Sequence, residues 1–128
     1  MSILATTLSG TGKNLSAEVL LNTFTATLDR NVALQIRLSN IPANDQTITI
    51  RVEYTTAADG VLGSKVCYDS SPKNAVANTT YSIDLGPAWM RVGEKLKIYA
   101  TSTDGTATNV SYRIDVLYTD IAMGGSIT

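Results

Sequence analysis

Hydrophobic and polar positions alternate along most of the chain. In residues 32–38 every even position is Val, Leu or Ile, and every odd position is small or polar. Such alternation is typical of a β-strand with one buried face. Residues 48–54 repeat the pattern after the turn-rich segment 39–46. We therefore expect these two strands to form an antiparallel pair, with Pro42 in the loop between them.

Shorter apolar patterns predict further strands. Apolar residues share one face across the Thr-rich stretch 20–28, where β-branched threonine favours strand over helix. Interrupted patterns predict strands over residues 62–68 and 81–85, after which the Gly86-Pro87 pair breaks the chain before Trp89. The shared face of the first segment carries Leu20, Phe24, Ala26 and Leu28, and the interrupted pattern of the second consists of Leu62, Val66 and Tyr68.

The segment KLKIYATSTDGTATNVSYRIDVLYTD has the pattern of a β-hairpin around Asp104-Gly105, with the apolar residues of both arms at even positions. A two-residue turn would place even positions opposite odd ones and expose one apolar face. We therefore predict a three-residue loop over residues 104–106, with Ile98 opposite Tyr112 in the core.

The same register makes further predictions for the two arms. It sets Leu96 opposite Ile114 inside, Lys97 opposite Arg113 outside, and Lys95 opposite Asp115 outside. One outer pair is repulsive and the other attractive, and each contributes only about 0.2–1 kcal/mol. The outer face of this hairpin is therefore not optimised as a charged solvent surface.

The strand pattern as a whole predicts an all-β fold. About seven or eight short strands, with turns every eight to twelve residues, indicate an antiparallel β-sandwich of jelly-roll or immunoglobulin-like topology, with a β-barrel as the alternative. We expect residues 17–120 to form the sandwich domain. Residues 1–16 and 121–128 have the composition of an extended N-terminal arm and a C-terminal tail, rather than of strands.

Size and charge narrow the classes of protein. The 128 residues and 13.6 kDa suit one domain. The formal net charge is −1, so no field attracts nucleic acid or an anionic membrane. The apolar runs are much shorter than the roughly 18 residues of a membrane span, and no signal-peptide pattern opens the chain. We expect no nucleic-acid or membrane partner and folding in a cytoplasm.

The side chains available for chemistry are few. The sequence has no histidine, which removes the commonest general base and metal ligand. Its one cysteine, Cys67, suits an ordinary strand thiol. Candidate carboxylates lie where structural roles suffice, such as Asp59 and Asp104 in turns and Glu53 on an outward strand position. We therefore expect no enzyme activity, no catalytic residue, no cofactor and no metal.

The aromatic residues offer a different function. Trp89 and the tyrosines could form a platform for sugar rings, as in carbohydrate-binding modules. Tyr99 alone of these falls on the predicted outer face, which assigns most of the set to the core. A carbohydrate-binding module is therefore the alternative reading of the fold.

Residues 93–120, from GEKLKIYATST through NVSYRIDVLYTD, resemble small β-sandwich structural proteins of tailed bacteriophages, and most nearly the capsid decoration or cement proteins. The resemblance carries no diagnostic motif. It implies a non-enzymatic virion protein on the capsid surface, assembled in the bacterial cytoplasm and forming a homo-oligomer, with a trimer favoured. It also implies that the partner is the major capsid protein, whose neighbouring subunits the protein would clamp.

The expected partner-binding residues follow from this reading. Ile3, Leu4 and Leu8 could anchor an N-terminal arm on a neighbouring subunit, because an added strand contributes backbone hydrogen bonds and apolar burial. Lys97, Tyr99 and Arg113 lie on the predicted outer face of the hairpin. If residues 1–12 are an arm, their deletion should leave the sandwich folded and weaken binding to shells.

Overall fold

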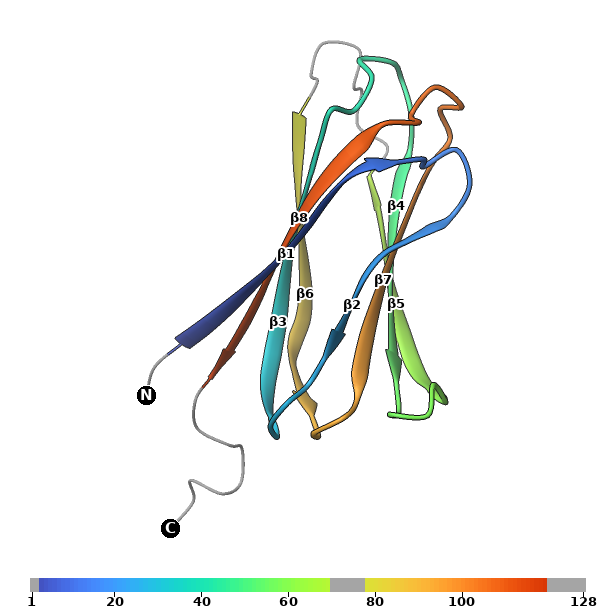
Figure 1. The fold of residues 1–128 in the computed structure, drawn as a ribbon. Helices are drawn as coiled ribbons and strands as arrows, with labels where there is room; N and C mark the ends of the chain where they lie inside the picture. The colour runs from blue at the N-terminus through green and yellow to red at the C-terminus, as the bar shows by residue number, and fades with distance from the viewer. Residues whose placement is uncertain (1–2, 70–77, 120–128) are drawn as a thin grey trace.

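The computed structural model describes residues 3–69 and 78–119, which form two antiparallel four-stranded sheets packed face to face (Figure 1). The strands are β1 (Ile3–Lys13), β2 (Val19–Thr25), β3 (Arg30–Ser39), β4 (Ile48–Thr55), β5 (Val61–Asp69), β6 (Asn78–Met90), β7 (Lys95–Ser102) and β8 (Val110–Thr119). Sheet A has the order β1-β8-β3-β6 and sheet B the order β2-β7-β4-β5. The predicted all-β sandwich is therefore confirmed, with a jelly-roll-like arrangement.

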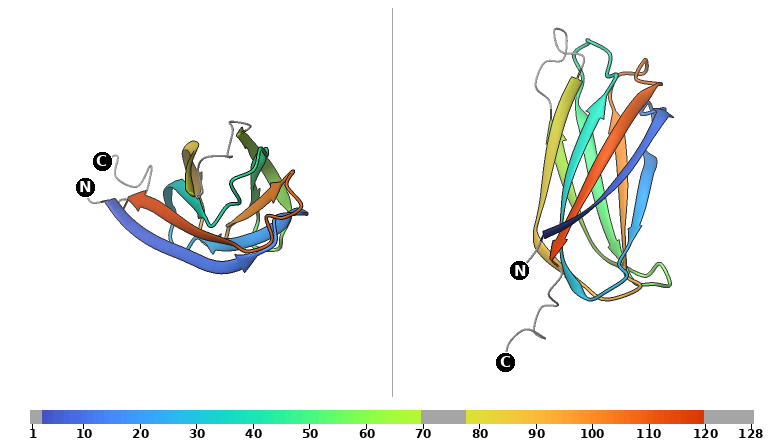
Figure 2. Two further views of the ribbon diagram at one scale, coloured as in Figure 1. Left: turned by 90° about the horizontal axis from the view of Figure 1, so that it is seen from above. Right: turned by 60° about the vertical axis from the view of Figure 1, so that its left-hand side comes forward.

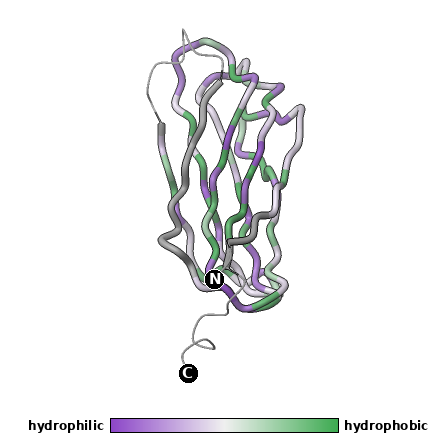
Figure 3. The backbone as a smooth tube through the Cα atoms, turned by 90° about the vertical axis from the view of Figure 1, so that its left-hand side faces the viewer, coloured by the Kyte–Doolittle hydropathy of each residue, from purple (hydrophilic) through white to green (hydrophobic). Residues whose placement is uncertain are grey.

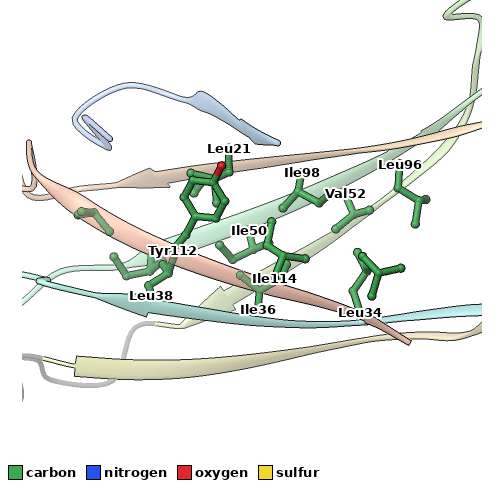
Figure 4. Close-up of a cluster of buried hydrophobic side chains, with 14 of the residues drawn as sticks. Leu21, Leu34, Ile36, Leu38, Ile50, Val52, Leu96, Ile98, Tyr112 and Ile114 are labelled. Atoms are coloured by element: carbon green, nitrogen blue, oxygen red, sulfur yellow. The ribbon is translucent and has the colours of Figure 1, made fainter. Parts of the chain in front are cut away.

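The core lies between the two sheets and is built from the alternating residues. Strands β3 and β7 alternate buried and more exposed positions along nearly their whole length. Figure 4 shows side chains of both sheets pointing toward one another, among them Ile36 and Ile114 from sheet A and Ile50 and Ile98 from sheet B. Each such fully buried side chain stabilises the fold by about 1.5–3 kcal/mol relative to exposure.

No helix in the described ranges is long and apolar enough to cross a membrane.

Two predicted strand pairs are wrong, because consecutive strands cross between the sheets. Strand β3 pairs with β6 and β8, whereas β4 pairs with β5 and β7. Likewise β7 belongs to sheet B and β8 to sheet A. Two strands that bury the same set of positions can lie side by side or face each other across a core. Parity alone does not distinguish these arrangements, and here the strands face each other.

The register predicted for the last two strands changes accordingly. Ile98 lies opposite Val52 within sheet B, and Tyr112 lies opposite Leu38 within sheet A. A turn does form after β7, where the Ala107 N–H donates to the Asp104 carbonyl at 3.1 Å, but it connects the two sheets. On the outer faces, the predicted pairs of Lys97 with Arg113 and Lys95 with Asp115 are replaced by Lys97 with Glu53 and Asp115 with Gln35.

The N-terminal segment is a strand, which corrects its interpretation as an arm. Strand β1 pairs antiparallel with β8 from Ile3, opposite Thr119, to Gly10, opposite Tyr112. Its Thr-, Ser- and Gly-rich sequence has few large apolar residues, so alternation is weak even though Leu8 packs against the core. Deletion of residues 1–12 would remove one of the two strands that pair with β8, so the deletion is expected to disturb the sandwich. The predicted C-terminal tail, 121–128, lies outside the described residues.

Smaller differences concern the faces and lengths of three strands. In β2 a register shift between Leu20 and Asn22 turns Leu21 into the core, while Leu20 is 40% exposed. Strand β6 runs through the Gly86-Pro87 pair, with a register shift opposite β3 between Val32 and Leu34. Strand β5 forms as predicted over most of its length, but its apolar residues Leu62, Val66 and Tyr68 are all exposed. A bulge accommodates an extra residue without ending the strand pairing.

Candidate functional site

One side of the sandwich is closed by the chain itself. Between β1 and β2 the chain passes from sheet A to sheet B, and Leu15 on this passage is fully buried. Its N–H donates to the Ala107 carbonyl at 2.8 Å, and its carbonyl accepts from the Ser102 N–H at 2.7 Å. The space between the sheets is thus filled on this side, which we call the closed side.

The opposite side ends in β5 of sheet B and β6 of sheet A, which we call the open side (Figure 2). Strand β5 carries apolar residues on both of its faces. We define the open edge as its exposed apolar set, Val61, Leu62, Val66 and Tyr68, which are 63%, 54%, 40% and 70% exposed. Exposed apolar residues grouped on one strand mark a binding surface more often than scattered ones do.

A hollow of about 420 Å³ lies beside the open edge. It is lined by Val52, Tyr54, Leu62, Gly63, Ser64, Lys65, Trp89 and Leu96. The Tyr54 hydroxyl donates to the Glu94 carboxylate and lies 3.3 Å from the Trp89 carbonyl oxygen. Burial, together with this carboxylate, raises the pKa of Tyr54 to about 12. The hydroxyl therefore remains a protonated donor held by the protein, and the lining is mostly apolar.

The outer face of sheet B carries a network of charged residues. The Arg51 guanidinium lies 4.2 Å above the centre of the Tyr99 ring and forms ion pairs with Glu18 at 2.7 Å and Glu53 at 2.9 Å. The hydrogen bond from Arg51 lowers the pKa of the Glu18 carboxyl. Stacking and pairing of this kind hold Tyr99 against its own sheet. Less of its ring is therefore available to a ligand than the sequence suggested.

Lys97 on the same face is also engaged within the chain. Its Nζ lies 3.0 Å from Oδ1 of Asp59, in the turn that precedes β5, and Lys95 Nζ lies at the same distance from that oxygen. The hydrogen bonds from these two lysines lower the pKa of Asp59, and the bond to Asp59 raises the pKa of Lys97. The pairs connect the start of β7 to the turn between β4 and β5.

The outer face of sheet A has a different cluster, centred on Asp115. Thr7 donates to its Oδ1 at 2.9 Å, Arg113 Nε lies 3.2 Å from the same oxygen, and Arg37 lies 4.0 Å from the other oxygen. The Thr7 hydrogen bond, aided by the two arginines, lowers the pKa of Asp115. The cluster joins three neighbouring strands, β1, β8 and β3.

The structure does not bring the predicted partner-binding residues together. Lys97 and Tyr99 lie on the outer face of sheet B, whereas Arg113 lies on the outer face of sheet A. Leu8 packs against the core from β1, and the side chains of Ile3 and Leu4 lie outside the described residues. The open edge is the surface that the sequence reasoning missed. The sequence feature that could have indicated it is the presence of large apolar residues at both odd and even positions of β5.

No group of three or more potential metal ligands occurs among the described side chains. Cys67 is a free, partly buried thiol that packs against the core, and the described aromatic side chains are split between core and surface. Tyr112 is buried, where its hydroxyl accepts a hydrogen bond from Asn22 at 3.0 Å, whereas Tyr68 is exposed.

Comparison with known proteins identifies the fold. No protein-family model matches the sequence, and no curated protein matches it. The VP2 subviral particle of infectious bursal disease virus superposes with a TM-score of 0.55 and 7% identity, covering 91% of this chain and 32% of VP2. The Gx strain of that virus gives 0.57 and 6%, covering 98% and 33%. The chain thus spans about a third of the viral capsid chains that it matches.

A glycoside hydrolase shares the fold as well. The arabinose-bound MgGH51 α-L-arabinofuranosidase has a TM-score of 0.54 and 12% identity, and the match covers 83% of this chain but 18% of the enzyme. At such identities the likeness shows a common β-sandwich and nothing finer. The fold is therefore one that viral capsid proteins use, although not they alone.

Proposed function

We propose that the chain is a non-enzymatic structural protein of a virus particle that acts by binding neighbouring subunits of the shell. The observation that carries the proposal is the match of more than nine tenths of the chain to VP2 of infectious bursal disease virus. The absence of histidine from the sequence agrees with a role that depends on surfaces rather than on catalysis. In its finer form, the protein decorates a tailed-bacteriophage capsid and clamps its major capsid protein.

The surfaces described above suit this role. Both sheets present broad outer faces, and the open edge offers apolar residues that a partner could cover. A protein that binds only the assembled shell stabilises that shell by mass action. An exposed strand can also add to a partner's sheet, where backbone hydrogen bonds supply affinity and side chains supply specificity. Clamping therefore requires no chemistry beyond burial and hydrogen bonding.

The test is binding to shells of the major capsid protein encoded in the same genome. Purified protein is mixed with shells that lack it, and co-sedimentation and the temperature of shell rupture are measured. We expect saturable binding at a fixed ratio to capsid subunits and a higher rupture temperature. Protein that stays in the supernatant at all concentrations would contradict the proposal.

Carbohydrate binding is the second candidate, and the hollow beside the open edge is the observation that favours it. Trp89 and Tyr54 both line this hollow, and aromatic faces suit sugar rings. Trp89 is the one tryptophan of the chain, so its fluorescence reports on this site alone. Under this candidate, titration with arabinan or other glycans changes the fluorescence in a saturable way. Unchanged fluorescence and no heat of binding in calorimetry would exclude it.

A further inference from the structure

Strand β5 ends sheet B with an edge that no described strand covers. The order of sheet B places β4 on one side of β5 and no strand on the other. Along this edge Val66 and Tyr68 are exposed, and the one charged residue between Gly63 and Tyr68 is Lys65. A strand of this length without proline is a template for pairing with another strand. Its occupant can be inferred from its backbone and its charges.

The hydrogen bonds of sheet B show which backbone groups of β5 point away from β4, toward its unpaired side. The Thr103 N–H donates to the Thr47 carbonyl at 3.1 Å, so the odd-numbered residues of β4 direct their backbone groups toward β7. Backbone groups alternate in direction along an antiparallel strand, and the even-numbered residues of β4 therefore face β5. Their partners in β5 are odd-numbered, since Ile50 lies opposite Cys67. The N–H and C=O groups of Ser64, Val66 and Tyr68 consequently point away from β4, toward the unpaired side of β5.

We propose that β5 pairs antiparallel with β5 of a second copy of this chain, about a two-fold axis at Cys67. The pairing would join two B sheets into one continuous eight-stranded sheet. In this register Val66 lies opposite Tyr68 of the second copy, twice, and both residues belong to the exposed outer face. The N–H and C=O groups on the unpaired side of each β5 then form hydrogen bonds with those of the other copy.

Charge favours this register over those with the axis at Lys65 or at Val66. An axis at Cys67 sets Lys65 opposite Asp69 of the second copy, an attractive pair that occurs twice. An axis at Lys65 would set two lysines against each other, and like charges directly opposite in a sheet are destabilising. An axis at Val66 would leave Lys65 opposite Cys67 without an opposite charge. The contact is isologous, so one surface serves both copies.

The register also places two Cys67 residues opposite each other at the axis. Because their backbone groups face β4, they form a non-hydrogen-bonded pair, in which the Cα atoms lie about 4.5 Å apart. A disulfide needs Cα atoms roughly 4.4–6.8 Å apart. Cys67 is the one cysteine of the chain and is free, so it reports on the axis without interference.

The experiment combines mass measurement with oxidation. Light scattering on the native protein should give twice the 13.6 kDa chain mass. A mild oxidant such as copper phenanthroline takes two electrons from the paired thiols, whose two protons pass to the solvent as the disulfide forms. A disulfide-linked dimer should then appear on non-reducing gels, and a thiol reductant should reverse it. Cys67→Ser should retain the noncovalent dimer and lose the cross-link.

Charge exchange tests the register. Lys65→Asp should weaken dimerisation roughly tenfold, because two attractive pairs become repulsive. The double variant Lys65→Asp with Asp69→Lys should restore it. Lys13→Asp makes the same change of charge in β1, at the far edge of the fold, and should leave dimerisation unchanged. Circular dichroism establishes that each variant is folded.

Four outcomes would overturn the proposal. These are a monomer at every concentration up to the millimolar range, a trimer of three times the chain mass, a dimer that resists cross-linking at Cys67, and a dimer indifferent to Lys65→Asp. The trimer that the resemblance to decoration proteins implies cannot be built from this two-fold contact alone. The proposal does not depend on a viral function, since the same edge and charges are present whatever shell or ligand the protein binds.

Discussion

The closed and open sides of the sandwich differ in how far the chain itself covers the edges of the two sheets. Every sheet ends in two strands whose outer backbone groups need partners or protection. On the closed side, β1 and β2 are consecutive, and the passage between them buries Leu15 between the sheets. On the open side, β5 carries an exposed apolar set and lies beside a hollow of about 420 Å³.

The difference separates residues that stabilise the fold from residues that remain available to partners. Leu15 is tied to both β7 and the turn after it by backbone hydrogen bonds, so its loss affects several elements together. Val61, Leu62, Val66 and Tyr68 contribute little burial within the chain. Substitutions on the closed side should therefore change stability, and substitutions on the open side should change association.

The largest effect is expected from Leu15→Ala. The variant leaves a cavity at a fully buried position between the sheets, and such changes lower the free energy of unfolding by about 2–5 kcal/mol. Urea denaturation followed by fluorescence measures the change. Leu28→Ala is the matched control, because Leu28 is 55% exposed and its truncation should cost less than about 0.5 kcal/mol. Equal effects of the two variants would remove the special role of the closed side.

Gly10→Ala should have the next largest effect. A Cβ at Gly10 would lie 2.6 Å from a ring carbon of Tyr112, so β1 or the buried ring must move. Overpacking of this kind costs about 1–3 kcal/mol of unfolding free energy. Gly105→Ala provides the comparison, because a Cβ there meets no atom within 4 Å. If both variants melt like the parent protein, β1 does not pack against Tyr112 as described.

Asp115→Asn tests the attachment of β1 to sheet A and should cost about 1 kcal/mol at neutral pH. The carboxylate accepts from Thr7 and pairs with two arginines, and its pKa is lowered from its ordinary 3.8. A group with a lowered pKa stabilises the fold above its unfolded-state pKa, and this contribution is lost as pH falls through the folded-state pKa. The difference between parent and variant should therefore shrink as the pH falls below 3.8, the ordinary pKa of the carboxyl. A difference independent of pH would show that the charge does not matter.

Tyr68→Ser on the open edge should have the smallest effect on the isolated chain. Because Tyr68 is 70% exposed, the free energy of unfolding at low protein concentration should change by less than about 0.5 kcal/mol. Association should weaken in the same variant, which sedimentation at increasing concentration measures. A large loss of stability in dilute solution would mean that the chain itself already uses Tyr68.

The sequence predicted the buried positions better than the pairing of the strands. Alternation in β3, β4, β7 and β8 identified their core residues, because burial depends on one strand and the face it presents. Pairing depends on which strands lie side by side, and the shared even positions of Ile98 and Tyr112 fit both a hairpin and a crossing of the core. Strand β1 was missed because the partner strand, rather than its own apolar residues, specifies it.

The candidate site was harder to predict for a related reason. Lys97, Tyr99 and Arg113 were chosen as outward residues of one hairpin, and two different sheets carry them. The chain also engages these side chains itself, through Asp59, Arg51 and Asp115 respectively. Exposure of β5 depends on its place at the end of sheet B, which no local pattern encodes. The sequence shows apolar residues at both odd and even positions of β5, but only the sheet order shows that they lie on an exposed edge strand.

The pairing of Ile3 with Thr119 has a consequence for protein engineering. The first and last described strands, β1 and β8, lie side by side, so the start of β1 and the end of β8 lie at the same end of the sandwich (Figures 1 and 3). A short linker could join these ends, and the chain could be reopened at the turn around Gly105, where added atoms meet open space. Such a circular permutant should keep all eight strands in place. It would also free both new termini for fusion to a cargo or an affinity tag.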